Sequence, residues 1–217
     1  YVQYLTYMGN LLRGNLGESL FNNQPVLDQI LAAVPYTLTL ALSALFISTI
    51  LGVGLGIISA LNHNSWIDSS AMVVALLGVS MPVFWLGLLL ILVFSVTLKW
   101  FPPMGQGSLD RLVLPALTLA LLSSATLARV VRSNMLDVLS DDYIRTAKAK
   151  GLRKNTIVVR HALRNALIPA VTLMGLQFGG LISGAVITET IFARIGLGRM
   201  YVESILNKDI TMIQGLT

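Results

Sequence analysis

The chain of 217 residues contains no cysteine, which excludes disulfide bonds and thiolate metal sites but does not identify a compartment. Its two histidines, His63 and His161, are too far apart in sequence to form a paired-histidine metal motif on one helix. Serine hydroxyls in its apolar runs are expected to donate hydrogen bonds to the helix backbone, and the base and orienting residues that would activate a serine nucleophile are missing. We therefore predict no catalytic site and no metal site in this chain.

Charge is also scarce. Charged residues make up 12% of the chain, against roughly 25% in ordinary soluble domains. Hydrophobic residues account for 55%, and the mean hydropathy is +0.76. This composition predicts an integral membrane protein in contact with a lipid bilayer.

Four runs with little or no charge are long enough to cross a bilayer as helices. They lack the alternation of a barrel strand, so helices are the expected solution. We predict an all-α fold with membrane helices at residues 34–60, 71–98, 112–136 and 165–188. The second run contains Pro82, which removes a helix hydrogen bond, so a kink or break is expected near Met81 and Pro82.

Residues 141–169 form a strongly basic island that holds seven of the fifteen Lys and Arg residues. Basic loops stay on the cytoplasmic side, which places a loop at residues 137–164 in the cytoplasm. Counting spans from it puts residues 61–70 inside and three segments outside, residues 1–33, 99–111 and 189–209. Arg129 and Arg132 are expected to reach the cytoplasmic headgroups. Topology accounts for the net charge of +5, so no nucleic acid partner is expected.

Glycines recur four residues apart inside the apolar runs. Such pairs leave one helix face without side chains, so that another backbone approaches closely, and we interpret them as packing sites. The pairs are Gly52 and Gly56, Gly175 and Gly179, and Gly180 and Gly184. The first pair is not a phosphate loop, because no strand precedes it and no Lys-Ser/Thr follows it.

A short helix is predicted within the basic island, beginning after Ser140. Asp141 and Asp142 in its first turn favour it through N-capping and through the helix dipole. Gly151 is well placed to end it.

This island also carries a family resemblance. The stretches Asp142–Leu152 and His161–Pro169 closely resemble the cytoplasmic loop of permease subunits of binding-protein-dependent ABC importers, in the dipeptide, oligopeptide and nickel branch. Ala147, Gly151 and Leu163 keep residues of the family's loop motif. Four positions depart from the general motif in the way usual for this branch, namely Arg145, Thr146, His161 and Arg164.

The resemblance covers nearly the whole chain. It continues through residues 14–19, 78–85, 189–192 and 196–199. Arg194 and Ile195 stand where the family usually has Trp-Pro, so the outer turn differs locally. The alignment implies that the family's first helix and most of its last are missing from this sequence.

The resemblance implies a type I ABC importer transmembrane domain whose loop helix is a coupling helix, docking into a groove on an ATP-hydrolysing subunit. It presents Tyr143, Ala147 and Lys150 on one face, and the small Ala147 and Ala149 allow close approach. The residues expected to couple are Asp142, Tyr143, Arg145, Thr146, Ala147, Ala149, Lys150, Gly151 and Leu152.

The resemblance also implies partners: a second, homologous permease subunit, two cytoplasmic ATPase subunits that bind ATP and Mg, and an extracytoplasmic solute-binding protein. By the same resemblance, the chain itself is expected to hold no cofactor, not to be an enzyme, and to lie in the cytoplasmic membrane of a prokaryote. Peptide is the expected cargo, with nickel, a nickel chelate or glutathione as alternatives within the branch. An ATP-independent secondary transporter or channel is the alternative of another class.

A translocation path is expected near the break and near an amide inside an apolar run. The residues expected to line it are Ser80, Met81, Pro82, Trp85 and Gln177.

Overall fold

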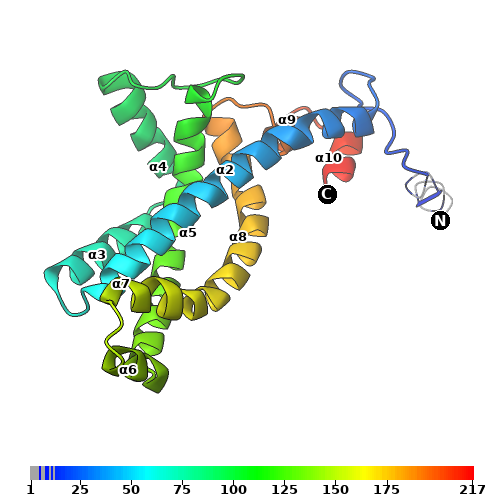
Figure 1. Ribbon diagram of the computed structural model, residues 1–217. Coiled ribbons are helices and arrows are strands. Elements are labelled where there is room, and N and C mark those ends of the chain that lie inside the picture. The colour runs from blue at the N-terminus through cyan, green and yellow to red at the C-terminus, as the bar shows by residue number, and fades with distance from the viewer. Residues whose placement is uncertain (1–4, 6–7, 10, 12) are drawn as a thin grey trace.

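The computed structural model describes Leu5, residues 8–9, Leu11 and residues 13–217, and the described part of the chain is mainly helical (Figure 1). The first part of the predicted outer segment 1–33 therefore lies partly outside the described residues. The helices are α2 (Val26–Leu61), α3 (Trp66–Ser80), α4 (Val83–Leu90), the π-helical η1 (Ile91–Thr97), α5 (Asp110–Ser140), α6 (Asp142–Ala149), α7 (Lys154–Thr156), the π-helical η2 (Ile157–Ala162), α8 (Leu163–Ile191), α9 (Leu197–Leu206) and α10 (Ile210–Leu216).

Helices occupy all four predicted runs. Within the described residues, α2, α5 and the stretch Lys154–Ile191 are each long and apolar enough to cross a membrane, and α3 with α4 and η1 passes the same test as a bent pair. The observed helices are longer than predicted. For example, α2 begins at Val26 rather than at residue 34, because Pro25 has a φ of −56° that suits a helix start.

The predicted break at Met81 and Pro82 is confirmed, and it is much sharper than a kink. Met81 is extended, with φ −88° and ψ 132°, as expected for a residue before proline. Pro82 then caps α4, and the two halves of the run differ in direction by 109°. The local chemistry of proline explains the break. The packing of α3 on α5, and of α4 on α5 and α8, sets the angle.

The seam between α2 and α5 depends on the first glycine pair. A Cβ placed on Gly52 would lie 2.9 Å from the carbonyl oxygen of Ser124, and one on Gly56 would lie 2.7 Å from the Cβ of Val131. This confirms close helix packing for that pair. The other pairs differ. A Cβ on Gly175, Gly179 or Gly180 would have no described atom from outside its own helical turn within 4 Å, whereas one on Gly184 would lie 3.3 Å from the Leu119 side chain.

Three apolar clusters hold the helices together. One lies where α6 and η2 pack on α5, around Met135, Ile144 and Ile157. A second joins α2, α5 and α8 around Leu40, and a third surrounds Phe192 beside α4. Many other large apolar side chains are exposed, as expected for helices that face hydrocarbon rather than water.

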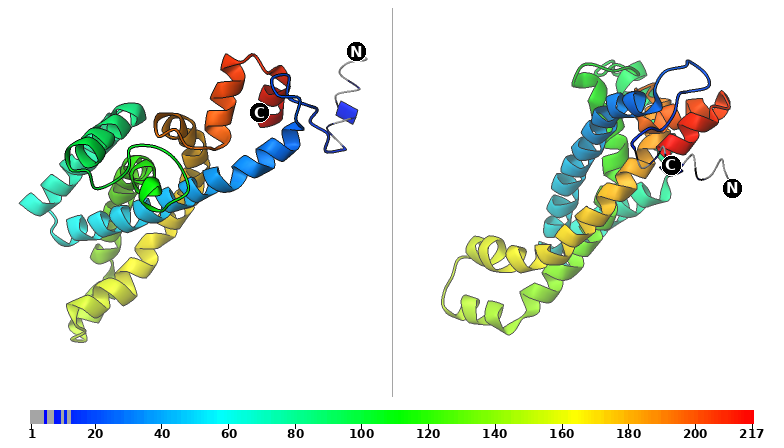
Figure 2. Two further views of the ribbon diagram at one scale, coloured as in Figure 1. Left: turned by 90° about the horizontal axis from the view of Figure 1, so that it is seen from above. Right: turned by 90° about the vertical axis from the view of Figure 1, so that its right-hand side faces the viewer.

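The long helices give the molecule two opposite ends (Figures 1 and 2). The α6 end carries α6, η2 and the turn between α2 and α3. The α9 end carries the loop between η1 and α5, together with α9, α10 and the beginning of α2. Trp66 at the start of α3 is 85% exposed and Trp100 after η1 is 64% exposed, as indole rings at membrane interfaces would be.

Candidate functional site

The helix predicted in the basic island is α6. It begins after Asp141, whose extended backbone (ψ 149°) separates it from α5 by one residue. The predicted side-chain N-cap is not formed, because the Ser140 hydroxyl donates to the Asp137 carbonyl at the end of α5 and the Asp141 side chain caps no N–H. The first-turn carboxylate of Asp142 still favours the helix through the dipole.

The C-terminal end of α6 is confirmed at Gly151. This residue has a φ of +75°, a left-handed conformation that suits glycine. Its N–H donates to the Lys148 carbonyl at 3.0 Å, and the Leu152 N–H donates to the Ala147 carbonyl at 3.3 Å. These two bonds form a Schellman motif, which stops the helix and turns the chain toward α7.

One prediction about the faces of α6 is corrected. Ala147 does not share an outward face with Tyr143 and Lys150, because it is only 8% exposed and packs with the fully buried Ile144 in the cluster around Met135. Ile144 and Ala147 are three residues apart and so lie on the same side of the helix. All eight remaining predicted residues are on the surface, namely Asp142, Tyr143, Arg145, Thr146, Ala149, Lys150, Gly151 and Leu152.

Tyr143 ties α6 to the start of α8. Its hydroxyl accepts a hydrogen bond from the Asn165 side chain at 2.9 Å and lies 3.4 Å from the His161 carbonyl. Sequence reasoning missed Ile144 and Asn165 as supports of α6. The signal for Ile144 was available, since it is the one large aliphatic residue between Asp142 and Ala149.

The exposed surface of this end is basic. All seven Lys and Arg residues of the island are exposed. One of them, Arg145, lies 3.4 Å from Asp142, but both side chains are so exposed that the pair contributes little stability.

The predicted path residues divide into two groups. Gln177 lines a pocket of about 330 Å³ between α4, α5 and α8, and Val83, directly after the break, lines the same pocket. Ser80, Met81, Pro82 and Trp85 do not line it. The Ser80 hydroxyl donates to the Leu76 carbonyl at 2.9 Å, and Met81 packs on the Phe192 cluster.

Gln177 is the polar feature of this pocket. Its amide nitrogen donates to the Ser123 carbonyl at 3.1 Å, whereas its side-chain oxygen is buried and has no partner within the described part of the chain. A buried acceptor without a donor is uncommon and is often explained by function.

Arg132 has a protein partner that the sequence analysis did not predict. Its guanidinium forms a two-point ion pair with Asp68 at the beginning of α3. Arg129, one turn earlier, is exposed.

At the α9 end, Glu189 attaches α9 to the core. Its buried carboxylate accepts hydrogen bonds from the Thr37 hydroxyl at 2.6 Å and from the backbone N–H groups of Gly198 and Arg199 at 2.8 and 3.1 Å. A negative side chain at a helix N-terminus is favourable. The sequence identified this stretch only through the family resemblance.

The turn that differs from the family pattern is held by its own contacts. Arg194 is 5% exposed and donates to the Arg111 carbonyl at 3.1 Å, and the Ile195 N–H donates to the Gln106 side chain at 2.6 Å. Burial lowers the pKa of the Arg194 guanidinium, while the Glu189 carboxylate opposes that shift.

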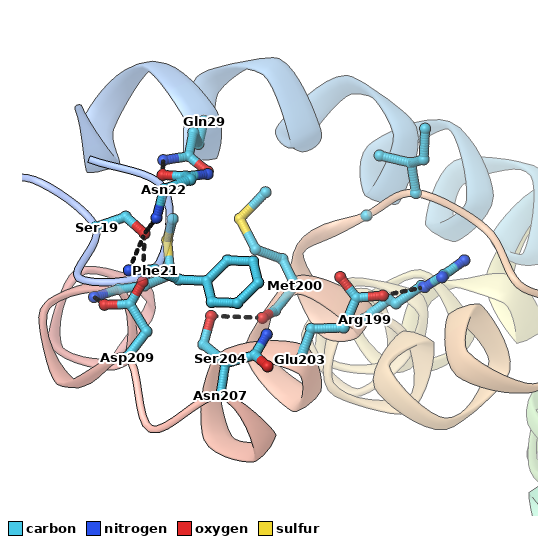
Figure 3. Close-up of a pocket in the computed structure, with 13 residues that line it drawn as sticks. Ser19, Phe21, Asn22, Gln29, Arg199, Met200, Glu203, Ser204, Asn207 and Asp209 are labelled. Atoms are coloured by element: carbon cyan, nitrogen blue, oxygen red, sulfur yellow. Dashed lines mark hydrogen bonds and ion pairs between the residues drawn. The ribbon is translucent and has the colours of Figure 1, made fainter. Parts of the chain in front are cut away.

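A pocket of about 320 Å³ opens at the same end, between the loop around Phe21 and helix α9 (Figure 3). Asp209 closes one side of it by accepting hydrogen bonds from the Ser19 hydroxyl and from the N–H groups of Leu20 and Met212. Burial acts to raise the pKa of Asp209, but these hydrogen bonds outweigh it and leave the pKa lowered. The pocket is lined by mixed polar and apolar side chains from α2, α9 and α10.

Comparisons with known proteins agree on the family. A family model described as "Binding-protein-dependent transport system inner membrane component" matches residues 52–217. The glutathione transport system permease protein GsiC of Escherichia coli is 44% identical over 214 residues, which are 99% of this chain and 70% of that protein. The di/tripeptide transport system permease protein DppB of Pseudomonas aeruginosa is 44% identical over 242 residues, covering 99% and 72%.

Solved structures show the same fold. A chain of the MetNI methionine ABC transporter, solved in inward-facing conformations, superposes with a TM-score of 0.73 at 17% identity and covers 87% of this chain and 86% of its own. A chain of an amino acid ABC transporter gives 0.62 at 16% identity, covering 87% and 84%. The expected type I importer fold is thereby confirmed.

Proposed function

Because the chain belongs to the family of binding-protein-dependent transport system inner membrane components, we propose that it is the permease subunit of an ATP-driven importer of small peptides. The observation that carries this proposal is α6, a short and basic helix that projects at one end of the long helices and is braced by α5 and α8. The chain binds no nucleotide. ATP and Mg belong to two partner ATPase subunits on the cytoplasmic side.

The exposed face of α6 is the surface offered to an ATPase subunit. Asp142, Arg145, Thr146, Ala149 and Lys150 are all exposed there. The buried side chains of Ile144 and Ala147 pack α6 against α5, so that a displacement of α6 is transmitted to α5. Rigid attachment is what a coupling element needs, because a loose loop would absorb the displacement.

The cargo is a small peptide. Relatives of equal identity are named for glutathione, which is itself a tripeptide, and for di- and tripeptides. Nickel or a nickel chelate is the alternative cargo. Ligand screening of the cognate binding protein distinguishes these, since a metal and a peptide differ in the donors that they require.

The cargo path runs beside the break at Met81 and Pro82. The Gln177 pocket supports this position, because it lies directly against Val83 and contains an unpaired acceptor. Ser80 and Trp85 remain proposed path residues on account of their exposure beside the break. A second permease subunit completes the path, and a solute-binding protein delivers cargo at the α9 end, where the Figure 3 pocket opens.

Reconstitution tests the function. The full-length permease, its partner permease, the ATPase subunits and the binding protein are assembled in proteoliposomes, and uptake of labelled dialanine and labelled glutathione is measured. We expect uptake that needs ATP and stops with a hydrolysis-dead ATPase. Uptake that persists on an ion gradient alone would instead identify a secondary transporter.

A further inference from the structure

A group of polar side chains joins the turn between α2 and α3 to the last third of α5. Its centre is Asp68, whose side chain is 6% exposed. The Arg132 guanidinium donates to both carboxylate oxygens, from Nε at 2.7 Å and from one terminal nitrogen at 2.6 Å. The Ser59 hydroxyl and the Asn64 N–H also donate to this carboxylate, the latter at 3.0 Å. Asp68 thus binds three separate parts of the chain at once.

His63 lies at the edge of the same group. Its Nδ1 is 3.4 Å from a carboxylate oxygen of Asp68 and 3.2 Å from a guanidinium nitrogen of Arg132. The side chain of His63 is 47% exposed, so it covers the pair from the solvent side and does not replace either partner.

Apart from this group, α3 is held on α5 by small side chains. Ala71 and Ala75 are its other buried residues. A Cβ on Gly78 would lie 3.3 Å from the Leu121 carbonyl, which places the same face close to the α5 backbone. Because these small side chains do not interlock, they do little to prevent α3 from sliding or rotating on α5. The two-point ion pair therefore supplies the directional contact between the two helices.

The two partners of the pair lie on helices that lead to different places: α5 leads to α6, and α3 leads to the break. Arg132 lies eight residues before the end of α5, and one residue then leads into α6, which packs back on Met135. Asp68 lies twelve residues before Ser80, about 18 Å along a helix, and Ser80 is the last residue before the break.

We propose that Asp68 and Arg132 are positioning residues for transport: their ion pair fixes α3 on α5 and transmits displacement of α6 to the break at Met81 and Pro82. The inference rests on the proposed function, in which an ATPase moves α6. Buried ion pairs often add little net stability, and fixing one arrangement of helices is their best-attested use. The ion pair passes movement from the α6 end to the Gln177 pocket, which lies beyond the break.

The test is the number of ATP molecules hydrolysed per dialanine taken up by the reconstituted importer. Asp68→Asn and Arg132→Gln should each raise this number about tenfold, and the double variant should match the single ones, because one contact is lost in every case. A purely structural defect lowers hydrolysis and uptake together and leaves the ratio unchanged.

Two matched controls lie on α5, the helix that carries Arg132. Asp137→Asn and Arg129→Gln remove the same charges from exposed positions of α5, and their ratios should stay within about twofold of the wild type. If Asp68→Asn fails to assemble, Ser59→Ala removes one donor to Asp68 without changing charge and should raise the ratio about threefold.

A wild-type ratio in the assembled variants, or additive effects in the double variant, would overturn the positioning role. A wild-type complex without ATP-dependent uptake would refute the proposed function instead, so the two failures are distinct.

Discussion

Glycine at position 56 is required by the distance between two helices. A Cβ there meets the Cβ of Val131 at 2.7 Å and the Ala128 carbonyl at 2.8 Å, both on α5. Neither neighbour is the flexible end of a long side chain, so the helices themselves must separate. Gly54, on the same stretch of α2, has nothing within 4 Å.

Gly56→Val should therefore destabilise the protein, and Gly54→Val should not. Forcing atoms into a packed seam typically costs about 1–3 kcal/mol. Thermal unfolding of the purified protein in detergent measures the difference. Equal midpoints for the two variants would contradict the packing role of Gly56.

Glu189 is the residue on which attachment of α9 depends. Glu189→Ala leaves the Thr37 hydroxyl and two backbone N–H groups without their acceptor, at a cost of about 3 kcal/mol. Hydrogen exchange at Gly198 and Arg199 should accelerate strongly. The control is Glu203→Ala, which removes an exposed carboxylate of α9 and should change exchange at these amides little.

Asp209 should make the α9 end sensitive to acid. Because its pKa is lowered in the folded protein, its carboxylate contributes stability that is present above the ordinary aspartate pKa and is lost as the pH falls through the lowered value. Relative to the intrinsic exchange rate at each pH, the protection of the Leu20 and Met212 amides should fall as the pH is lowered below about 4. Asp209→Asn should remove this pH dependence, whereas Asp28→Asn, an exposed change on α2, should leave it in place.

At the scale of elements, α6 has two alanines with opposite environments. Ala149 is exposed, whereas Ala147 packs against α5 and η2. A bulky side chain at Ala149 would meet the proposed ATPase subunit, whereas one at Ala147 would displace α6 itself.

Ala149→Trp should abolish peptide uptake and ATPase binding while leaving the thermal midpoint of the isolated permease unchanged. Ala147→Trp should lower that midpoint as well, because overpacking costs about 1–3 kcal/mol of folding free energy. Co-purification of the ATPase and thermal unfolding are measured for both variants. Normal ATPase binding by Ala149→Trp would contradict the docking face proposed for α6.

Some features of the helices could be predicted from the sequence and others could not. The break at Pro82 and the end of α6 at Gly151 were predictable, because each follows from the backbone chemistry of one residue. The 109° angle was not, because it depends on how three other helices pack. The Asp68–Arg132 pair joins residues 64 positions apart. Once both had been placed at the same membrane face, their opposite charges were the signal that would have paired them.

At the scale of the whole molecule, the family fold places α6 and the loop before α5 at opposite ends of the long helices (Figure 1). Sequence charge alone predicted which end faces the cytoplasm. The shape of the α9 end was beyond prediction, because Glu189, Arg194 and Asp209 take partners from distant segments.

Residues 1–217 contain no cysteine, so a single thiol introduced there is the only maleimide target within this stretch and allows the orientation to be tested directly. Ser108→Cys, in the exposed loop before α5, should react with a membrane-impermeant maleimide in intact cells. Asn155→Cys, exposed in α7, should react only after permeabilisation. The reverse pattern would invert the proposed orientation.

The connection between α5 and α6 is a single extended residue, Asp141, and the Tyr143 hydroxyl fastens α6 to the opening of α8. Such a short joint has no slack. Even a small displacement of α6 must therefore move α5 and α8 together, so that these two spans respond at the same time and not one after the other.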